Sequence, residues 1–194
     1  MRQGPRRKVR DNVLYDAIEA SKAERFDDDI WRAVRADRDP LRGSSSGGRW
    51  DDGTFEVLYA SLEADGALAE MYFHLMRGQP VFPSRMQFCL YKLRAKLRRA
   101  LRLSDLGKLA TLGVDITKYG SLEYLRRHDE YSRTQEIAEI AHFLDFDGVI
   151  VPSARWKCRN LVLFTDRVPP DALNVAEKLH PIDWAQWKSR TQAS

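Results

Sequence analysis

The sequence has little of several features that would assign it to a familiar class. Its 194 residues include two cysteines, Cys89 and Cys158, which are too few and too far apart for a disulfide framework. No apolar run approaches the ~20 residues that a transmembrane helix needs, and none follows the N-terminus as in a secretory signal. The four histidines show no metal-ligand spacing. We therefore expect one soluble domain in the reducing cytoplasm, without a metal site and without a membrane association.

Positive charge is concentrated at the N-terminus. The isoelectric point is about 9.1. Five of the 32 lysines and arginines fall in the first ten residues, so residues 11–194 carry 27 basic against 28 acidic side chains, a net charge of −1. A basic arm can steer a protein toward phosphates, but a solvated tail is the favoured interpretation. Direct binding of nucleic acid is therefore not expected.

The hydrophobic pattern predicts helices and strands in mixed order. Residues 91–98 alternate apolar and basic side chains, which indicates a half-exposed strand rather than a basic amphipathic helix, and the cations would discourage edge-to-edge pairing. Without regular βαβ alternation, the class is α+β. The other expected elements are helices at 12–25, 64–77, 119–127 and 134–144, a helical turn starting at 104–106, strands at 30–34, 55–60, 149–151 and 161–164, and a loop at 37–54.

One acid lies in the middle of an apolar helix. Glu70 follows Ala67-Leu68-Ala69 and precedes Met71-Tyr72-Phe73. An unpaired buried charge is costly, so the acid either pairs with an arginine, reaches solvent, or lines a pocket. In a pocket, a carboxylate can stabilise an oxocarbenium-like centre or bind a sugar hydroxyl.

Two arginines are candidates for binding an anion. Arg32 lies in the first expected strand, and Arg49 follows Gly48 in a glycine–serine loop. Guanidinium groups match pyrophosphate oxygens in a bidentate manner, and glycines let backbone N–H groups approach the same anion. The loop has neither a dinucleotide fingerprint nor P-loop spacing. Surface charge is the alternative explanation for either arginine.

Two aromatics and a serine complete the candidate set. Trp50 and Tyr59 could stack on a flat ring, although aromatics near strand ends are more often core residues. Ser153 follows Pro152 at a strand end, and no histidine motif supports a serine-hydrolase triad. Together with the arginines and Glu70, these residues suit a ligand that is anionic at one end and carries a sugar or a cation at the other.

In this order the motifs resemble the RES-domain toxins, a family named for an arginine, a glutamate and a serine. The resemblance covers about residues 30–166. The matching segments are Trp31-Arg32, Gly48-Arg49-Trp50, Val57-Leu58-Tyr59-Ala60-Ser61, Ala67-Leu68-Ala69-Glu70, Asp147-Gly148-Val149-Ile150-Val151-Pro152-Ser153-Ala154 and Asn160-Leu161-Val162-Leu163-Phe164. The chain departs from the family pattern at Asp51-Asp52-Gly53, where the family has asparagine and proline ahead of a glycine.

The resemblance implies a fold similar to ADP-ribosyltransferase toxins, with mostly antiparallel sheets flanked by helices. It implies that NAD is a substrate, with no cofactor, and that a cognate antitoxin carries a helix-turn-helix domain. A homo-oligomer within the antitoxin complex is a further possibility. The implied catalytic residues are Arg32, Tyr59, Glu70 and Ser153. The implied NAD-binding residues are Arg32, Gly48, Arg49, Trp50, Tyr59 and Asn160.

The expected organisation is a basic tail with a short helix (1–29), a RES domain (30–166) and a C-terminal segment (167–194) that packs on the domain or trails it. The expected activity is cleavage of NAD at the nicotinamide–ribose bond by water or phosphate, which depletes NAD and arrests growth. Three alternatives stay open: ADP-ribosyl transfer to a protein, a non-catalytic nucleotide-binding module, and a nucleic-acid-binding module that uses the basic tail and the cations of residues 92–98.

Overall fold

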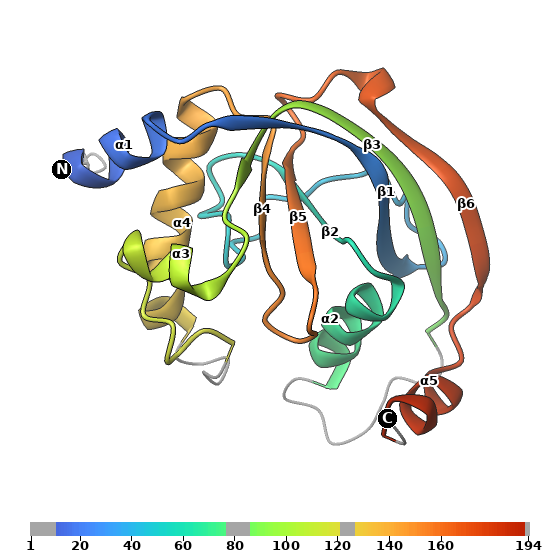
Figure 1. Cartoon of the computed structure of the whole chain (residues 1–194). Helices are drawn as coiled ribbons and strands as arrows, with labels where there is room; N and C mark the ends of the chain where they lie inside the picture. Colours follow the sequence, from blue (N-terminus) through green and yellow to red (C-terminus); the bar gives the residue numbers. More distant parts are fainter. Residues whose placement is uncertain (1–10, 77–85, 121–126, 193–194) are drawn as a thin grey trace, which may run out of the picture.

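Six strands and five α-helices make up the computed structural model, which describes residues 11–76, 86–120 and 127–192 (Figure 1). A short 3₁₀ helix, η2, is also present. The elements in chain order are α1 (Asn12–Glu19), β1 (Ala23–Arg35), β2 (Val57–Ser61), α2 (Ala64–Met76), β3 (Phe88–Arg102), α3 (Leu106–Thr111), α4 (Arg127–Phe143), β4 (Gly148–Pro152), β5 (Arg159–Phe164), η2 (Pro170–Ala172), β6 (Leu173–Pro181) and α5 (Trp184–Gln192).

The strands form two three-stranded halves of one sheet. Long antiparallel pairings join β1 to β3 and β3 to β6, while β5 pairs antiparallel with both β2 and β4. The halves meet at two places only: β3 runs parallel to β4 over Ala100–Arg102, and β1 pairs with β2 through Trp31 and Ser61. The predicted α+β class with mostly antiparallel pairing is therefore confirmed.

Three apolar cores fill the spaces that this arrangement creates. One lies between the two halves and includes Ile30, Leu58 and Leu93. A second lies on the other face of β2, β5 and β4, where α1 and α4 cover residues such as Val162. The third joins α2 and α5 to one end of β1 and β3. Figure 1 shows α1, α3 and α4 grouped on one side of the molecule and α2 and α5 near the other end of the sheet.

The alternating strand is present and longer than predicted, but its cations do not guard a sheet edge. β3 buries Tyr91, Leu93, Ala95 and Leu97 and turns the intervening cations outward. It pairs with β1, β4 and β6, so it is an interior strand. Lys92 lies 2.6 Å from Asp29 and Arg94 lies 2.5 Å from Asp27, both on β1. The cations therefore take part in cross-strand ion pairs instead of protecting a free edge.

Other predicted elements shift at their ends. The first helix ends at Glu19 and not near residue 25, because the chain continues as β1 from Ala23. β1 thus crosses residue 30, where the RES domain was expected to begin. Beyond residue 166, where it was expected to end, β6 pairs with β3, and this strand was not predicted. The helix expected at 134–144 begins at Arg127. The helix expected at 119–127 falls mostly on residues outside the described part, and residues 119–120 form a turn.

Two further properties follow from the described residues. Cys89 and Cys158 are both free thiols. Among the helices that the structure describes, none combines the length and apolar character needed to cross a membrane.

Gly148 provides a test of the packing between β4 and β5. A Cβ atom at this position would overlap the carbonyl oxygen of Val162 and lie 3.1 Å from the Cα of Leu163. Because both obstacles are backbone atoms inside the sheet, Gly148→Ala should lower the free energy of unfolding by about 1–3 kcal/mol. Urea denaturation measures this loss. An unchanged midpoint would show that the two strands are less tightly paired than described.

Candidate active site

Glu70 lies on α2 and is half-buried, as its position in an apolar helix predicts. One carboxylate oxygen, Oε1, accepts a hydrogen bond from Ser153 Oγ at 2.8 Å and another from Asn160 Nδ2 at 2.9 Å. No lysine, arginine or histidine that the structure describes forms an ion pair with Glu70. The alternative of a structural Glu–Arg pair is thus unsupported, and the carboxylate is held by neutral donors.

The two donors come from neighbouring strands. Ser153 follows β4 in a turn that its own backbone N–H closes by donating to Cys158 O, and its Oγ also accepts from the N–H groups of Arg155 and Trp156 at 3.2 Å each. Asn160 pairs with Val151 on β4 and with Ser61 on β2. Its Oδ1 is buried without a hydrogen-bond partner in the described structure. The sheet therefore fixes both side chains against α2.

A buried aspartate organises the glycine loop. Asp51 has no exposed surface. Its carboxylate accepts from the backbone N–H of Gly47 at 2.9 Å, from that of Gly48 at 2.8 Å, and from the Tyr59 hydroxyl at 3.2 Å. The Gly48 N–H is therefore donated to Asp51. The NAD-binding role of this glycine stays a prediction. The departure from the family pattern at residue 51 is what shapes the loop.

Gly48 is required here for steric reasons. A Cβ at this position would lie 2.5 Å from the Tyr59 hydroxyl oxygen and 2.9 Å from Asp51 Oδ2. Those distances are too short for any side chain larger than hydrogen. The glycine thus lets the backbone approach Tyr59 and Asp51 closely.

Tyr59 and Trp50 hold the loop from inside. The Tyr59 hydroxyl accepts from the Trp50 N–H at 3.0 Å while donating to Asp51, and burial together with the nearby Asp51 charge raises the pKa of Tyr59 well above its usual value. The hydroxyl therefore stays protonated as a donor. Trp50 is only 2% exposed and belongs to the core beside α4. Its indole supports the loop and does not present a surface for stacking on a ligand.

Helix α4 anchors the same loop from the other side. Gln135 Nε2 donates to the carbonyl oxygens of Gly48 and Asp51 at 2.8 and 3.0 Å, and Thr134 Oγ1 donates to Arg49 O at 2.6 Å. Backbone groups on both sides of Arg49 are thus bound to fixed elements. A loop rich in glycine and serine, which would otherwise be flexible, has a defined conformation around Arg49.

Arg49 is placed between two tyrosines. Its guanidinium carbon lies 4.5 Å from the centre of the Tyr119 ring and 4.9 Å from that of Tyr131. The Tyr119 hydroxyl donates to Pro152 O at 2.7 Å, next to Ser153. Burial raises the pKa of Tyr119 to about 12, and the charges of Arg49 and Glu70 act on it in opposite directions. Tyr119 therefore lies within electrostatic range of both the cation and the acid.

Arg32 is hydrogen-bonded to the backbone of the loop that follows β1. Its Nη1 donates to the carbonyl oxygens of Pro40 and Arg42 at 2.6 and 2.9 Å, and burial lowers its pKa to about 10. On β1 it lies between Ile30 and Val34, which face the core between the two half-sheets. No hydrogen bond joins Arg32 to Glu70, Ser153 or Asn160. Hydrogen bonds thus join Glu70 to Ser153 and Asn160, whereas those of Arg32 go to the loop after β1.

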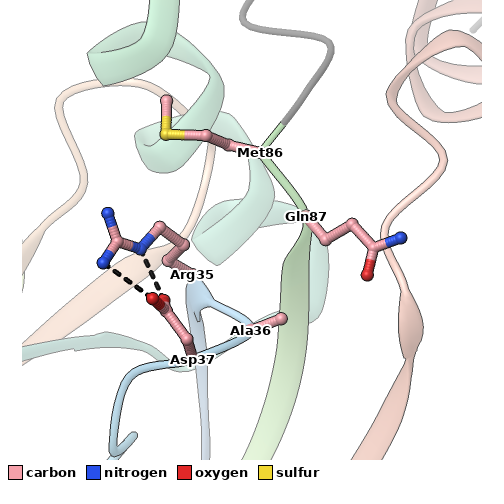
Figure 2. Close-up of a pocket in the computed structure, with 5 residues that line it drawn as sticks. All are labelled: Arg35, Ala36, Asp37, Met86 and Gln87. Carbon is pink, nitrogen blue, oxygen red and sulfur yellow. Dashed lines mark hydrogen bonds and ion pairs between the residues drawn. The ribbon is translucent and has the colours of Figure 1, made fainter.

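An open pocket lies away from these residues, at the end of β1 and the start of β3 (Figure 2). Arg35, Ala36, Asp37, Met86 and Gln87 line it. Arg35 is bound to Asp37 by two hydrogen bonds of 2.5 and 2.8 Å, so its charge is already neutralised. None of the predicted site residues lines this pocket. The described residues also contain no group of three or more His, Cys, Asp or Glu side chains that could hold a metal ion.

Several site residues were missed by sequence reasoning. Tyr119, Tyr131 and Gln135 lie far from the motifs in sequence and carry no spacing signal. Asp51 was noticed only as a departure from the family pattern, and a carboxylate three residues after Gly48 could have suggested an acceptor for loop N–H groups.

The fold and the site define a class: an α+β domain in which one half-buried acid is held by a serine and an asparagine from adjacent strands. A family model described as RES domain matches residues 29–187. The chain belongs to the RES domain family, which confirms the resemblance seen in the motifs. The match extends beyond residue 166 and includes β6 and the start of α5.

A solved structure shares this fold. The crystal structure of the M. tuberculosis MbcT–MbcA toxin–antitoxin complex contains a chain that superposes with a TM-score of 0.76 at 20% identity, covering 92% of this chain and 97% of that one. At this identity the similarity establishes the fold alone. No curated protein matches the sequence.

The loop network predicts different effects for two neighbouring aspartates. In Asp51→Asn, one of the two acceptor oxygens becomes an NH₂ group that faces the N–H of either Gly47 or Gly48, so the free energy of unfolding should fall by about 1–3 kcal/mol. Asp52 is exposed and bonds only to Thr54. Asp52→Asn should therefore change the free energy of unfolding by less than about 0.5 kcal/mol. Urea denaturation of the pair measures the difference, and equal effects would exclude the organising role of Asp51.

The raised pKa of Tyr119 predicts a pH dependence of stability. An unfolded tyrosine loses its proton near 10.0, whereas Tyr119 in the fold does so near 12. Between these values the unfolded chain is deprotonated first, so the free energy of unfolding should fall as the pH rises through this window. Tyr119→Phe should make the decline shallower, without abolishing it, because Tyr59 also has a raised pKa. Denaturation at a series of pH values tests this, and identical slopes would contradict it.

Proposed function

We propose that this chain cleaves NAD at the bond between nicotinamide and ribose, as the toxin of a toxin–antitoxin pair. The proposal rests on how the Glu70 carboxylate is held. Ser153 and Asn160 hold one carboxylate oxygen, and no described cation neutralises the charge. A carboxylate oriented in this way is available to stabilise positive charge in a ligand.

The chemistry follows from the substrate. When the glycosidic bond breaks, its electron pair goes to the ring nitrogen, nicotinamide leaves as a neutral molecule, and positive charge grows on ribose C1′ and its ring oxygen. Glu70 stabilises that charge as it forms. An acceptor oxygen then bonds to C1′ and loses its proton. With water this is hydrolysis, with phosphate it is phosphorolysis, and with a protein side chain it is ADP-ribosyl transfer.

Arg49 is the best-supported partner for the pyrophosphate. Two tyrosine rings and a backbone fixed by α4 hold it in place, and Tyr119 connects it to the strand end beside Ser153. A preorganised guanidinium can bind phosphate oxygens in a bidentate manner. Arg32 supplies a second positive charge from β1 and holds the chain at Pro40 and Arg42. Tyr59 and Trp50 act by shaping the Arg49 loop.

The biological assignment has two supports. The chain belongs to the RES domain family, and a structural relative comes from a toxin–antitoxin complex. We therefore include a cognate antitoxin with a helix-turn-helix domain as a partner, and growth arrest through loss of NAD as the outcome. A nucleic-acid-binding function has less support, because Lys92 and Arg94 on the outer face of β3 are already paired with aspartates of β1.

Replacing the acid tests the proposed role directly. Glu70→Gln keeps the size of the side chain and removes the charge, so NAD turnover should fall by about 10²–10³-fold. Release of nicotinamide from purified, antitoxin-free protein is the measurement, with water, phosphate and a cell extract offered as acceptors. Glu63→Gln is the matched control, because Glu63 is exposed one residue before α2 begins. It should retain the wild-type rate.

Two results would count against the proposal in different ways. If Glu70→Gln keeps its turnover, Glu70 does not stabilise the transition state. If the folded wild-type protein leaves NAD intact with every acceptor, the chain does not cleave NAD.

A further inference from the structure

The C-terminal helix α5 is attached to the helix that carries Glu70. Trp187 is 9% exposed, and its Nε1 donates to Asp65 Oδ1 at 3.0 Å. Arg190, one turn later, donates to the same oxygen at 2.5 Å. Asp65 lies in the first turn of α2. Two side chains of α5 therefore bind one carboxylate at the start of α2.

The Trp187 ring also touches both segments that form the bond between Glu70 and Ser153. Its centre lies 5.5 Å from that of Tyr72 on α2 and 6.3 Å from that of Trp156. The backbone N–H of Trp156 donates to Ser153 Oγ, and this Oγ in turn donates to Glu70. One indole thus packs against the helix that carries the acid and against the turn that carries its donor.

This contact matters because the site depends on a single carboxylate oxygen. Ser153 and Asn160 reach Glu70 Oε1 from the sheet, while Glu70 itself is on α2. Bonds of this kind weaken steeply with distance and angle, so a small shift of α2 relative to the sheet would break them. Side chains on α2 and the Trp156 turn pack on Trp187 in the core that includes Ala67 and Leu68.

We propose that Trp187 is a positioning residue that sets the place of Glu70 relative to Ser153 and Asn160. It acts through Asp65 and Tyr72 on one side and through Trp156 on the other. The kinetic part of this inference rests on the proposed cleavage of NAD. The geometric part does not, because it concerns only the hydrogen bonds of Glu70.

The test compares two tryptophans of the same helix. Trp187→Phe removes the N–H that binds Asp65 and shortens the ring that reaches Trp156. Because a displaced catalytic group slows the chemical step, kcat for NAD should fall about tenfold or more. KM should change by less than about twofold, because Arg49 and its loop are untouched. Trp184→Phe is the control: Trp184 packs on Tyr72, on Phe88 and edge-on against the Trp187 ring, but it has neither the bond to Asp65 nor the contact with Trp156.

A second measurement does not require activity. The side-chain amide of Asn160 donates to Glu70, so its NMR signal, assigned with Asn160→Ala, reports whether that bond persists. The signal should move in Trp187→Phe and stay in place in Trp184→Phe. If wild-type protein leaves NAD intact, the proposed function fails while this signal still decides the positioning role. An unmoved Asn160 signal, or an equal loss of kcat in both variants at equal thermal stability, would overturn the inference.

Discussion

A carboxylate that is removed from water without a cation must be satisfied by hydrogen-bond donors, and this constraint governs the site. Around the site this occurs at two acids, Asp51 and Glu70. Asp51 is fully buried and receives two backbone N–H groups and the Tyr59 hydroxyl. Glu70 is half-buried and receives Ser153 and Asn160 on one oxygen. The first acid is fully enclosed, whereas the described hydrogen bonds of the second all fall on one oxygen, Oε1.

The architecture follows from the need to bring these donors together. Tyr59, Asn160 and Ser153 come from β2, β5 and the end of β4, three strands that pair side by side, so their relative positions are set by backbone hydrogen bonds. The acids come from outside this half-sheet, Asp51 from the loop before β2 and Glu70 from the helix after it. Helix α4 then fixes the loop, and α5 packs against α2. The paired strands thus set the positions to which the loop before β2 and helix α2 are hydrogen-bonded.

Sequence patterns within a single segment correctly predicted the elements whose burial is decided within that segment. The alternation in residues 91–98 and the apolar helix around Glu70 are both present, because burial of one face or one stripe decides them. The grouping of Glu70, Ser153 and Asn160 was anticipated through the family resemblance. The partners of Arg49 could not be predicted, since Tyr119 and Tyr131 reach it only through tertiary packing. The contacts of Arg32 with Pro40 and Arg42 likewise depend on how the loop after β1 folds back on the strand.

The departure at Asp51 shows why a residue type alone does not define its role. A glycine–arginine loop is typical of phosphate binding because free N–H groups and a guanidinium meet the same anion. Here the N–H groups of Gly47 and Gly48 already bind the Asp51 carboxylate. In the same loop, the rings of Tyr119 and Tyr131 pack on the Arg49 guanidinium, so aromatic contacts set its position beside the buried aspartate.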